Sequence, residues 1–302
     1  MIKNGSEIIH KSEICAIVIT YNAKKFIAKT IYYLLKNIDN IVVVDNNSTD
    51  GTIEVIKNMQ SPNVHLILNK KNYGIAKALN QGVEYASKRG FEWVLTMDQD
   101  SIISENMINE MNKVYSSLTC FERRQVACLA PRIIYNDEND KRQTSNNSYR
   151  EKDVVITSGN LVKISAINLV GGYEESLFID SVDFDFCLKL KKQKLKILVC
   201  NNAVMNHSLG ETFIKKIFGV SFLVHTHSQI RKYYIARNHV YIIKKYLLSD
   251  FSFCFKKNFF FLIFVFQNVI IEDNRVSNIK VIFKGLLDGI KGKYGEKSID
   301  IA

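Results

Sequence analysis

Residues 14–22 read ICAIVITYN, residues 41–51 read IVVVDNNSTDG and residues 93–100 read WVLTMDQD. Each stretch is an apolar run of strand length that ends in small polar or acidic side chains. The segments 23–37 and 76–88 instead repeat apolar residues at helical spacing. Alternating strand and helix patterns predict parallel βαβ units. We therefore expect an α/β fold with a mostly parallel, Rossmann-like central sheet and helices on both of its faces.

Polar residues follow the first two predicted strands. In such folds ligands bind beyond the carboxyl ends of the strands, which is where Thr20, Tyr21, Asn22 and Asp45 fall. An ionised carboxylate only accepts hydrogen bonds, so Asp45 suits a base or a ribose. The same residue types also form ordinary turns and helix caps. Asp50, for example, can simply cap the helix that follows it.

Residues 72–82, NYGIAKALNQG, open the predicted helix 76–88. Gly74 and the alanines after it allow a ligand to approach closely, and the free N–H groups of a helix N-terminus suit a phosphate. Close packing of the helix would explain the small residues equally well. The sequence has neither a G-x-G-x-x-G fingerprint nor a P-loop, which argues against simple nicotinamide or ATP binding.

Two carboxylates end the predicted strand 93–97. Asp98 and Asp100 occupy alternate positions directly after five apolar residues. Acidic groups at the mouth of a buried strand are costly unless they have partners. Hard oxygen ligands suit Mg²⁺ or Mn²⁺, which often share their coordination shell with substrate phosphates. The pair therefore predicts a contact with a metal ion or a nucleotide.

The ordered set VITYN, VVDNNSTDGT, NYGIAKALNQG and WVLTMDQD resembles the nucleotide-sugar half of family 2 glycosyltransferases with the GT-A fold. It is most similar to the bacterial rhamnosyltransferase branch. The later stretches GGYEESLFIDSVDFDFCLKL, MNHSLGE and YYIARN match the acceptor half of that family in order. The resemblance covers residues 13–240. It implies a GT-A domain over 1–212, with a nucleotide-sugar half (13–100) and an acceptor half (101–212), before a mainly helical C-terminal region (213–302).

The resemblance also implies roles for individual residues. Asp100 is expected to bind a Mg²⁺ or Mn²⁺ ion, Asp98 the ribose or the metal, and His207 the metal or the diphosphate. The residues expected to bind the nucleotide sugar are Thr20, Tyr21, Asn22, Asp45, Asn72, Gly74, Lys77, Asp98 and Gln99.

The family's catalytic base is the second acid of a Glu-Asp pair, which reads Val182-Asp183 in this sequence. Asp183 is therefore the expected base, and the missing Glu leaves the first position without an assigned role. Asp180 and Asp185 are its competitors. Each helical residue advances by about 100°, so Asp183 and Asp185 point about 200° apart and only one of them can face the sugar.

A basic and aromatic cluster lies farther along the chain, in the predicted helical region. It consists of Arg231, Tyr233, Tyr234 and the pair Arg237-Asn238. These side chains could contact the diphosphate or the acceptor. A solvated amphipathic helix would explain them as well.

The reaction implied by the resemblance is inverting and metal-dependent. It moves a sugar, L-rhamnose from dTDP-rhamnose, onto a cell-surface polysaccharide or a lipid-linked saccharide. The alternatives are a UDP-sugar donor of the galactose or glucose type, and a non-catalytic protein that binds nucleotide sugars. Nucleic-acid binding would require a basic element with base-reading side chains, and none is visible in the sequence.

The formal net charge of +11 is concentrated near the C-terminus. Residues 201–302 contain 15 Lys+Arg and 7 Asp+Glu, so they carry +8 of the total. They include NFFFLIFVFQNVII (258–271), which at 14 residues is shorter than the roughly 18 needed to span a bilayer. We expect this run to bind an anionic membrane surface, to contact a second subunit in a homo-oligomer, or to be buried.

The N-terminal residues and the cysteines bear on localisation. The first 14 residues have no apolar stretch typical of a secretory signal, and the six cysteines form no C-x-x-C pair. We therefore expect a cytoplasmic protein with reduced thiols, placed at the inner face of the cell membrane if the C-terminal region binds lipid.

Overall fold

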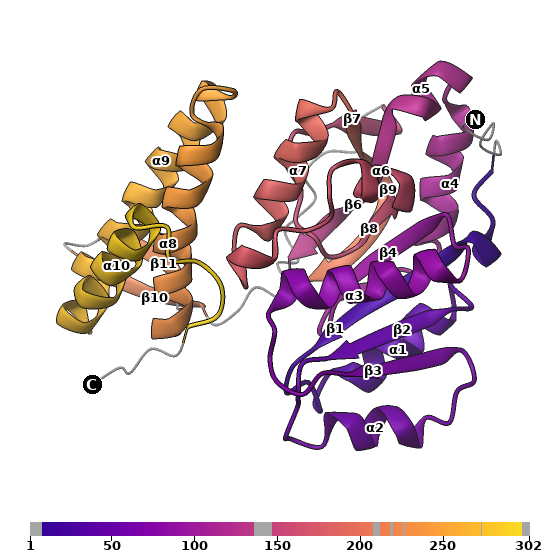
Figure 1. Ribbon diagram of the computed structural model, residues 1–302, viewed down its shortest axis with the longest axis horizontal. Helices are drawn as coiled ribbons and strands as arrows, with labels where there is room; N and C mark the ends of the chain where they lie inside the picture. Colours follow the sequence, from indigo (N-terminus) through magenta and orange to yellow (C-terminus); the bar gives the residue numbers. More distant parts are fainter. Residues whose placement is uncertain are drawn as a thin grey trace. The chain divides into compact units, whose positions relative to one another are not determined.

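The structure is a computed structural model that describes residues 8–135, 147–207, 212–217, 220–225, 227–272 and 274–297. The chain divides into two compact units (Figure 1). The first comprises residues 1–174 and 183–208, and the second comprises residues 175–182 and 209–302. The short segment 175–182, which lies within the predicted GT-A domain, thus packs with the C-terminal unit.

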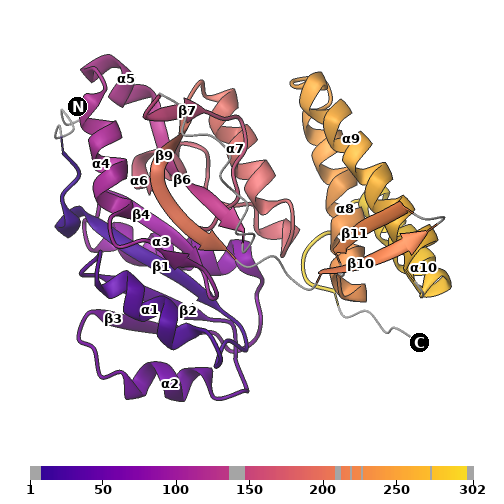
Figure 2. The same cartoon turned by 180° about the vertical axis from the view of Figure 1, so that it is seen from behind.

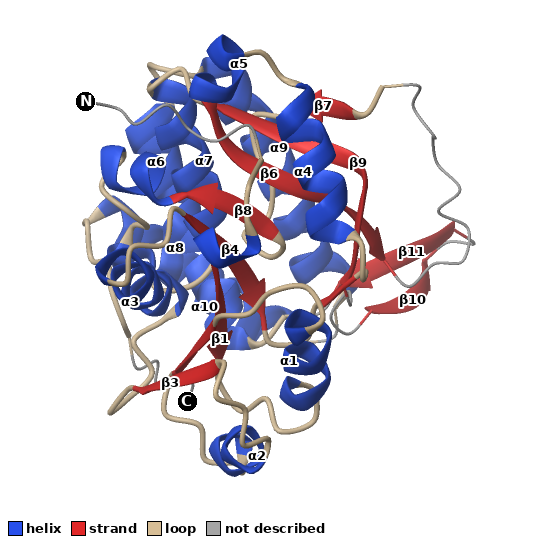
Figure 3. Cartoon of the chain, turned by 90° about the vertical axis from the view of Figure 1, so that its right-hand side faces the viewer, coloured by secondary structure: helices blue, strands red, loops and turns tan. Residues whose placement is uncertain are grey.

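The first unit is built on a nine-stranded mixed sheet with the order β3-β2-β1-β4-β8-β6-β9-β5, and β7 also pairs with β9. Strands β4, β8, β6 and β9 of this sheet can be followed in Figure 3. Strands β1 to β4 are parallel to one another, and β6 is parallel to β9. Strand β8 runs antiparallel between β4 and β6. The strands are β1 Ile14–Thr20, β2 Ile41–Asp45, β3 Val64–Leu68, β4 Trp93–Asp98, β5 Ile102–Ile103, β6 Val126–Tyr135, β7 Tyr149–Glu151, β8 Asn160–Lys163 and β9 Lys196–His207.

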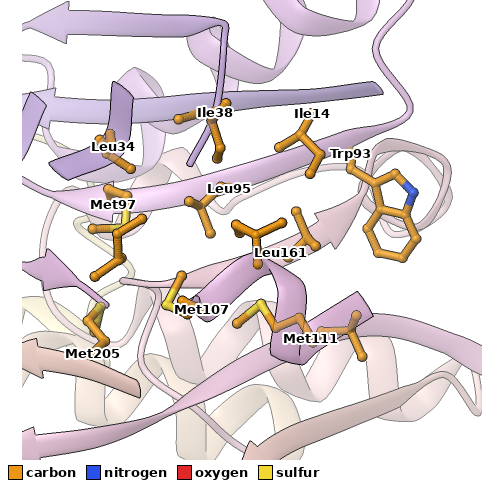
Figure 4. Close-up of a cluster of buried hydrophobic side chains, with 14 of the residues drawn as sticks. Ile14, Leu34, Ile38, Trp93, Leu95, Met97, Met107, Met111, Leu161 and Met205 are labelled. Carbon is orange, nitrogen blue, oxygen red and sulfur yellow. The ribbon is translucent and has the colours of Figure 1, made fainter. Parts of the chain in front are cut away.

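Helices cover both faces of this sheet, as predicted. All seven residues of β1 are buried, because alternate side chains enter two different cores. Ile14, Ala16 and Val18 belong to the cluster drawn in Figure 4, which also contains residues of α1 and α4. Ile17 faces α3 on the other side. The helices of this unit are α1 Ile27–Leu35, α2 Thr52–Asn58, α3 Ile75–Lys88, α4 Met107–Ser117, α5 Cys120–Gln125, α6 Ile164–Leu169 and α7 Val182–Lys192.

From its sequence, the apolar run at residues 154–157 is predicted to be a strand, but the structure has none there. The strands in this part of the chain are β7 and β8, on either side of that apolar run. Side chains take up its backbone carbonyls: Thr96 Oγ1 donates to Thr157 O at 2.6 Å, and Asn160 Nδ2 donates to Ile156 O at 2.7 Å. The run is therefore satisfied by side chains and not by a neighbouring strand.

The second unit contains a hairpin and three long helices (Figure 2). The hairpin, β10 Thr212–Ile217 with β11 Val220–His225, lies in a stretch that was predicted to be mainly helical. The helices are α8 Gln229–Tyr246, α9 Phe251–Phe266 and α10 Arg275–Ile290, and α9 continues through a π-helical turn to Ile271.

Helices α8 and α10 pack closely because α10 presents glycines to α8. A Cβ atom at Gly285 would lie 2.5 Å from the carbonyl oxygen of Tyr233. One at Gly289 would lie 2.7 Å from the carbonyl oxygen of Arg237. Any larger residue at either position would force the two helices apart.

Candidate active site

Three candidate metal ligands meet at one edge of the sheet of the first unit. Asp98 ends β4, Asp100 follows two residues later, and His207 ends β9. The ligand atoms of the three side chains all lie within 4.8 Å of one another, and each residue is partly exposed. The structure thus brings together residues more than one hundred positions apart, as the resemblance implied.

Two buried serines, which the sequence analysis missed, connect these ligands. Ser158 Oγ accepts the backbone N–H of Asp98 at 3.0 Å and lies 2.9 Å from Ser101 Oγ. Ser101 Oγ in turn lies 2.8 Å from Nδ1 of His207. With its proton on Nδ1, His207 donates to Ser101 and keeps the Nε2 lone pair for an ion. Such outer contacts fix the orientation of a metal-binding imidazole.

The ends of β1 and β2 are joined through Asp45. Thr20 Oγ1 donates to Asp45 Oδ1 at 2.9 Å, and both residues are fully buried. The Asp45 carboxylate also accepts the backbone N–H of Ser48 at 2.8 Å and its hydroxyl at 2.5 Å. Thr20 and Asp45 are therefore buried beneath the loop that follows β2 and fix its conformation through Ser48. A ligand at the carboxyl ends of β1 and β2 would contact that loop.

Tyr21, Asn22 and Gln99 lie above this buried pair. The backbone N–H of Tyr21 donates to Gln99 Oε1 at 2.8 Å, which ties the end of β1 to the loop after β4. Asn22 adopts a left-handed φ of 53°, and its side-chain oxygen accepts the N–H of Thr49 at 2.9 Å. Tyr21 is 47% exposed, so its ring is available to a planar partner such as a base.

The loop before α3 is fixed by asparagines. Asn72 Oδ1 accepts the N–H of Gly74 at 2.9 Å, and Asn46 Nδ2 donates to the carbonyl of Gly74 at 3.2 Å. Gly74 has φ 84° and ψ 171°, a conformation open essentially to glycine alone. Asn46 is a structural residue that the sequence analysis did not single out. Lys77 lies partly exposed in the first turn of α3.

Asp50 has a structural role beside the start of α2, although the N-cap of that helix is Gly51. Its carboxylate accepts the N–H of Thr52 at 3.0 Å and the N–H of Lys24, also at 3.0 Å. These hydrogen bonds, with the Thr52 hydroxyl as the largest contributor, hold the pKa of Asp50 below its usual value. The residue therefore fixes the start of α2.

The acids near the start of α7 have different surroundings. The Asp185 side chain is fully buried, with Lys189 Nζ 3.1 Å from Oδ2. Asp183 is partly exposed, and its Oδ1 accepts the N–H of Phe184 at 2.8 Å. In the second unit, Arg231 donates to both carboxylate oxygens of Asp180 at 3.2 to 3.3 Å. Asp183 stays our prediction for the base.

Most of the basic and aromatic cluster of α8 is buried. The buried members therefore neither face solvent nor are open to a diphosphate or an acceptor, which were the two interpretations of the sequence. Tyr233, Arg237 and Asn238 are fully buried, and Tyr234 is 1% exposed. Asn238 Nδ2 lies within 3.0 Å of the carbonyl oxygens of residues 177, 179 and 180. The cluster therefore holds the segment 175–182 against α8 within the second unit.

A mixed sheet with helices on both faces, and with acidic side chains beyond the end of a parallel strand, is the architecture of GT-A glycosyltransferases. The chain belongs to glycosyl transferase family 2, whose sequence profile matches residues 15–173. The enzyme class that the resemblance implied is thereby confirmed.

The relatives extend this assignment beyond the matched segment. The chain is 30% identical to the dTDP-rhamnosyl transferase RfbF of Shigella flexneri, over 94% of this chain and 97% of that protein. Among solved structures, residues 1–349 of TarS from S. aureus align over 92% of this chain and 80% of that one, with a TM-score of 0.59 and 15% identity. GalNAc-T7, solved with UDP, GalNAc and Mn²⁺, aligns over 68% of this chain and 44% of that one, with a TM-score of 0.52 and 13% identity.

Proposed function

We propose that this glycosyltransferase moves L-rhamnose from dTDP-rhamnose onto a saccharide acceptor, with inversion and with the help of a divalent cation. The observation that carries the proposal is the meeting of Asp98, Asp100 and His207 at the edge of the sheet. The similarity to a dTDP-rhamnosyl transferase along nearly the whole chain supports the choice of donor.

The three side chains fit a divalent cation. Two carboxylates and one imidazole, with ligand atoms within 4.8 Å of one another, suit Mn²⁺ and, through the carboxylates, Mg²⁺. When bound, such a cation neutralises the charge of the departing diphosphate. Asp183 would accept the proton of the attacking hydroxyl. The buried pair of Asp185 with Lys189 fixes the first turns of α7, on which Asp183 lies.

Asp183→Asn tests the assignment of the base. We expect it to lower the rate of nucleotide release from donor and acceptor by about 10² to 10⁴, the usual contribution of a general base, and to leave dTDP binding with Mn²⁺ unchanged. Asp153→Asn is the control, because the Asp153 side chain is 63% exposed in a surface pair with Lys191. Near-normal turnover of Asp183→Asn would show that another group is the base. Release of free nucleotide by the unaltered protein, given donor and acceptor, separates a transferase from a protein that only binds the donor.

The donor is tested by thermal shift with dTDP-, UDP- and GDP-sugars in the presence of Mn²⁺ or Mg²⁺. We expect dTDP-rhamnose to stabilise the protein most, and removal of the cation with EDTA to abolish most of the shift. A larger shift with a UDP-sugar would overturn the rhamnose assignment and leave the family unchanged.

We further propose that the second unit binds an anionic membrane surface, which suits a lipid-linked acceptor. Helix α9 and its π-helical turn, Phe251–Ile271, are long and apolar enough to cross a bilayer, and only 17% of the most apolar window is buried. Its exposed apolar side chains are joined by others on α10. The most exposed of these, between 58% and 69%, are Phe251, Phe255, Phe259, Phe260, Leu262, Val276, Phe283 and Ile290.

Charge and packing favour a helix that lies in the membrane surface. Helix α9 carries Lys256 and Lys257, and its inner side is already bound to α8, where His239 stacks on Phe261 at 4.0 Å. Glu272 and Asp288 are buried in ion pairs with lysines, and because each pair is neutral it leaves the charge surplus unchanged. The surplus of +8 over residues 201–302 is therefore carried by the other side chains, which favours anionic lipid over a second copy of the same basic chain.

Phe260→Glu tests this surface against Phe121→Glu, since the two rings are 67% and 70% exposed but Phe121 lies on α5 of the first unit. We expect the protein to co-sediment with phosphatidylglycerol vesicles and far less with phosphatidylcholine vesicles. Phe260→Glu should reduce this binding, and Phe121→Glu should not. A dimer that Phe260→Glu dissociates, without any vesicle binding, would identify the surface as a subunit interface instead.

A further inference from the structure

The first unit contains a basic cleft that the proposed function does not yet use. Its volume is about 500 Å³, and it is lined by β6, β7, β9 and the residues that lead into β8. Arg132, Arg150 and Lys152 all line it, together with the ring of Tyr135. The cleft lies entirely within the first unit.

The basic and acidic side chains on and after β7 alternate along the chain and have different surroundings. Arg150 and Lys152 line the cleft, whereas the intervening and following acids pair elsewhere. Glu151 lies 3.2 Å from Lys196 Nζ, and Asp153 lies 2.8 Å from Lys191 Nζ. Within the described parts of the chain, no acidic side chain pairs with the three cations of the cleft. Three cations gathered in one cleft attract an anionic ligand.

A buried acceptor in the same cleft lacks a hydrogen-bond partner. Asn160 is 5% exposed, and its Oδ1 has no partner among the described residues. Its Nδ2 donates to the carbonyl of Ile156 at 2.7 Å, which fixes the orientation of the amide. An unpaired buried acceptor is costly. This oxygen has almost no exposed surface, so a ligand hydroxyl would satisfy it only after a shift of the cleft wall uncovers it.

The cleft adjoins the candidate metal site. Ser158 lines it and also accepts the N–H of Asp98 at 3.0 Å. Tyr135 lies opposite His207 in the register of β6 and β9, with ring centroids 6.3 Å apart. A ligand in the cleft would therefore reach toward the place where the transferred sugar is expected.

We propose that this cleft is an acceptor subsite for an anionic saccharide. The acid group of the ligand, a carboxylate or a phosphate ester, would pair with Arg132, Arg150 and Lys152. A sugar hydroxyl would donate to Asn160 Oδ1 after a shift of the cleft wall uncovers that oxygen. The inference deepens the proposed function, since it names the chemical class of the acceptor.

Saturation-transfer NMR with three small probes tests the subsite. The probes are methyl glucuronide, glucose 6-phosphate and the neutral methyl glucoside, each added with Mg²⁺ and saturating dTDP so that the metal and nucleotide sites are already occupied. We expect both charged probes to bind and the neutral one to bind at least about tenfold more weakly, as expected for hydrogen bonds between charged groups. The relative affinities of the two charged probes distinguish a carboxylate ligand from a phosphate ligand.

The double variant Arg150→Gln/Lys152→Gln should weaken binding of the charged probes by about tenfold or more. Lys113→Gln is the control, since that side chain is 73% exposed on α4. Dissociation constants for dTDP with Mn²⁺ should be equal in all three proteins. Equal binding of neutral and charged probes, or undiminished binding by the double variant, would overturn the subsite. Failure of the proposed donor would instead appear as lost dTDP binding in the unaltered protein.

Discussion

Replacing Arg237 with methionine should destabilise the second unit strongly. The Arg237 side chain is fully buried and donates to the carbonyl oxygens of Gly295, Leu177 and Ser176 at 2.6, 2.9 and 3.2 Å. Burial lowers the pKa of its guanidinium, because the charged form loses its hydration. The segment that it holds includes Phe178, Asp180 and Ser181 at φ between 62° and 65°. Each such non-glycine residue costs about 1 kcal/mol or more.

The expected decrease in the free energy of unfolding depends on which of the three carbonyl oxygens keep a hydrogen-bond donor after Arg237 is replaced. Leu177 O still accepts from Asn238, and Ser176 O still accepts from the N–H of Gly295. The hydrogen bond to Gly295 O is lost without replacement. Loss of hydrogen bonds from a charged donor, reduced by the recovered cost of burying the charge, gives a decrease of about 2 to 4 kcal/mol in the free energy of unfolding.

Arg231→Met on the same helix is the matched control. It makes the same chemical change, but Arg231 is 49% exposed and forms a surface pair with Asp180. We expect it to cost at most about 1 kcal/mol. Urea unfolding followed by circular dichroism, with hydrogen exchange of α8 as a local probe, compares the two variants. An equal decrease in the free energy of unfolding in Arg237→Met and Arg231→Met would refute the view that the buried guanidinium holds residues 175–182 in place.

Three further outcomes are expected. Ser101→Ala should weaken Mn²⁺ binding by about 10 to 100-fold in calorimetry, because His207 loses its outer contact, whereas Ser116→Ala should leave it unchanged. Gly82→Ala should lower the free energy of unfolding by about 1 to 3 kcal/mol in thermal unfolding, because the added Cβ would lie 2.4 Å from Ile17 Cγ2. An unchanged free energy of unfolding would mean that α3 and β1 are less tightly packed. Burial lowers the pKa of His239 from 6.5 to about 4, so in that window the unfolded chain binds a proton that the folded chain does not. Stability should therefore fall by about 1.4 kcal/mol for each pH unit of acidification in that range, and urea unfolding of His239→Gln should lack this contribution.

The strands β1, β2 and β4 could be predicted because each is an apolar run buried from both sides and followed directly by polar residues. Strand β8 could not, since its four residues carry no stronger β signal than residues 154–157 nearby. Its place is set by antiparallel pairing with β4 and β6, which are distant in sequence. The same pairing brings Ser158 to Asp98, and no local pattern in the sequence marks that serine.

The C-terminal helices show a second limit of local patterns. The apolar run 258–271 looked too short to span a bilayer, but the helix that contains it begins earlier, at Phe251. Asp250 caps that beginning by accepting the N–H of Phe253 at 3.1 Å. Likewise, a cationic and aromatic sequence on α8 is typical of a ligand-binding surface. It became a core because the carbonyls of residues 176–180 supply the acceptors that its side chains need.

The assignment of the base rests on how the structure separates three neighbouring acids. Helical geometry sets Asp183 and Asp185 on different sides of α7 but does not say which one faces inward. Full burial of Asp185 beside Lys189 removes it from any bound acceptor, because a general base must reach the proton that it takes. Asp180 has both oxygens engaged by Arg231, so it would have to give up that pair before it could act. Asp183, partly exposed in the first turn of α7, requires neither change. The variants Asp180→Asn and Asp185→Asn should therefore alter stability more than the pH dependence of transfer, whereas in Asp183→Asn the ionisation of the base should disappear from the pH profile.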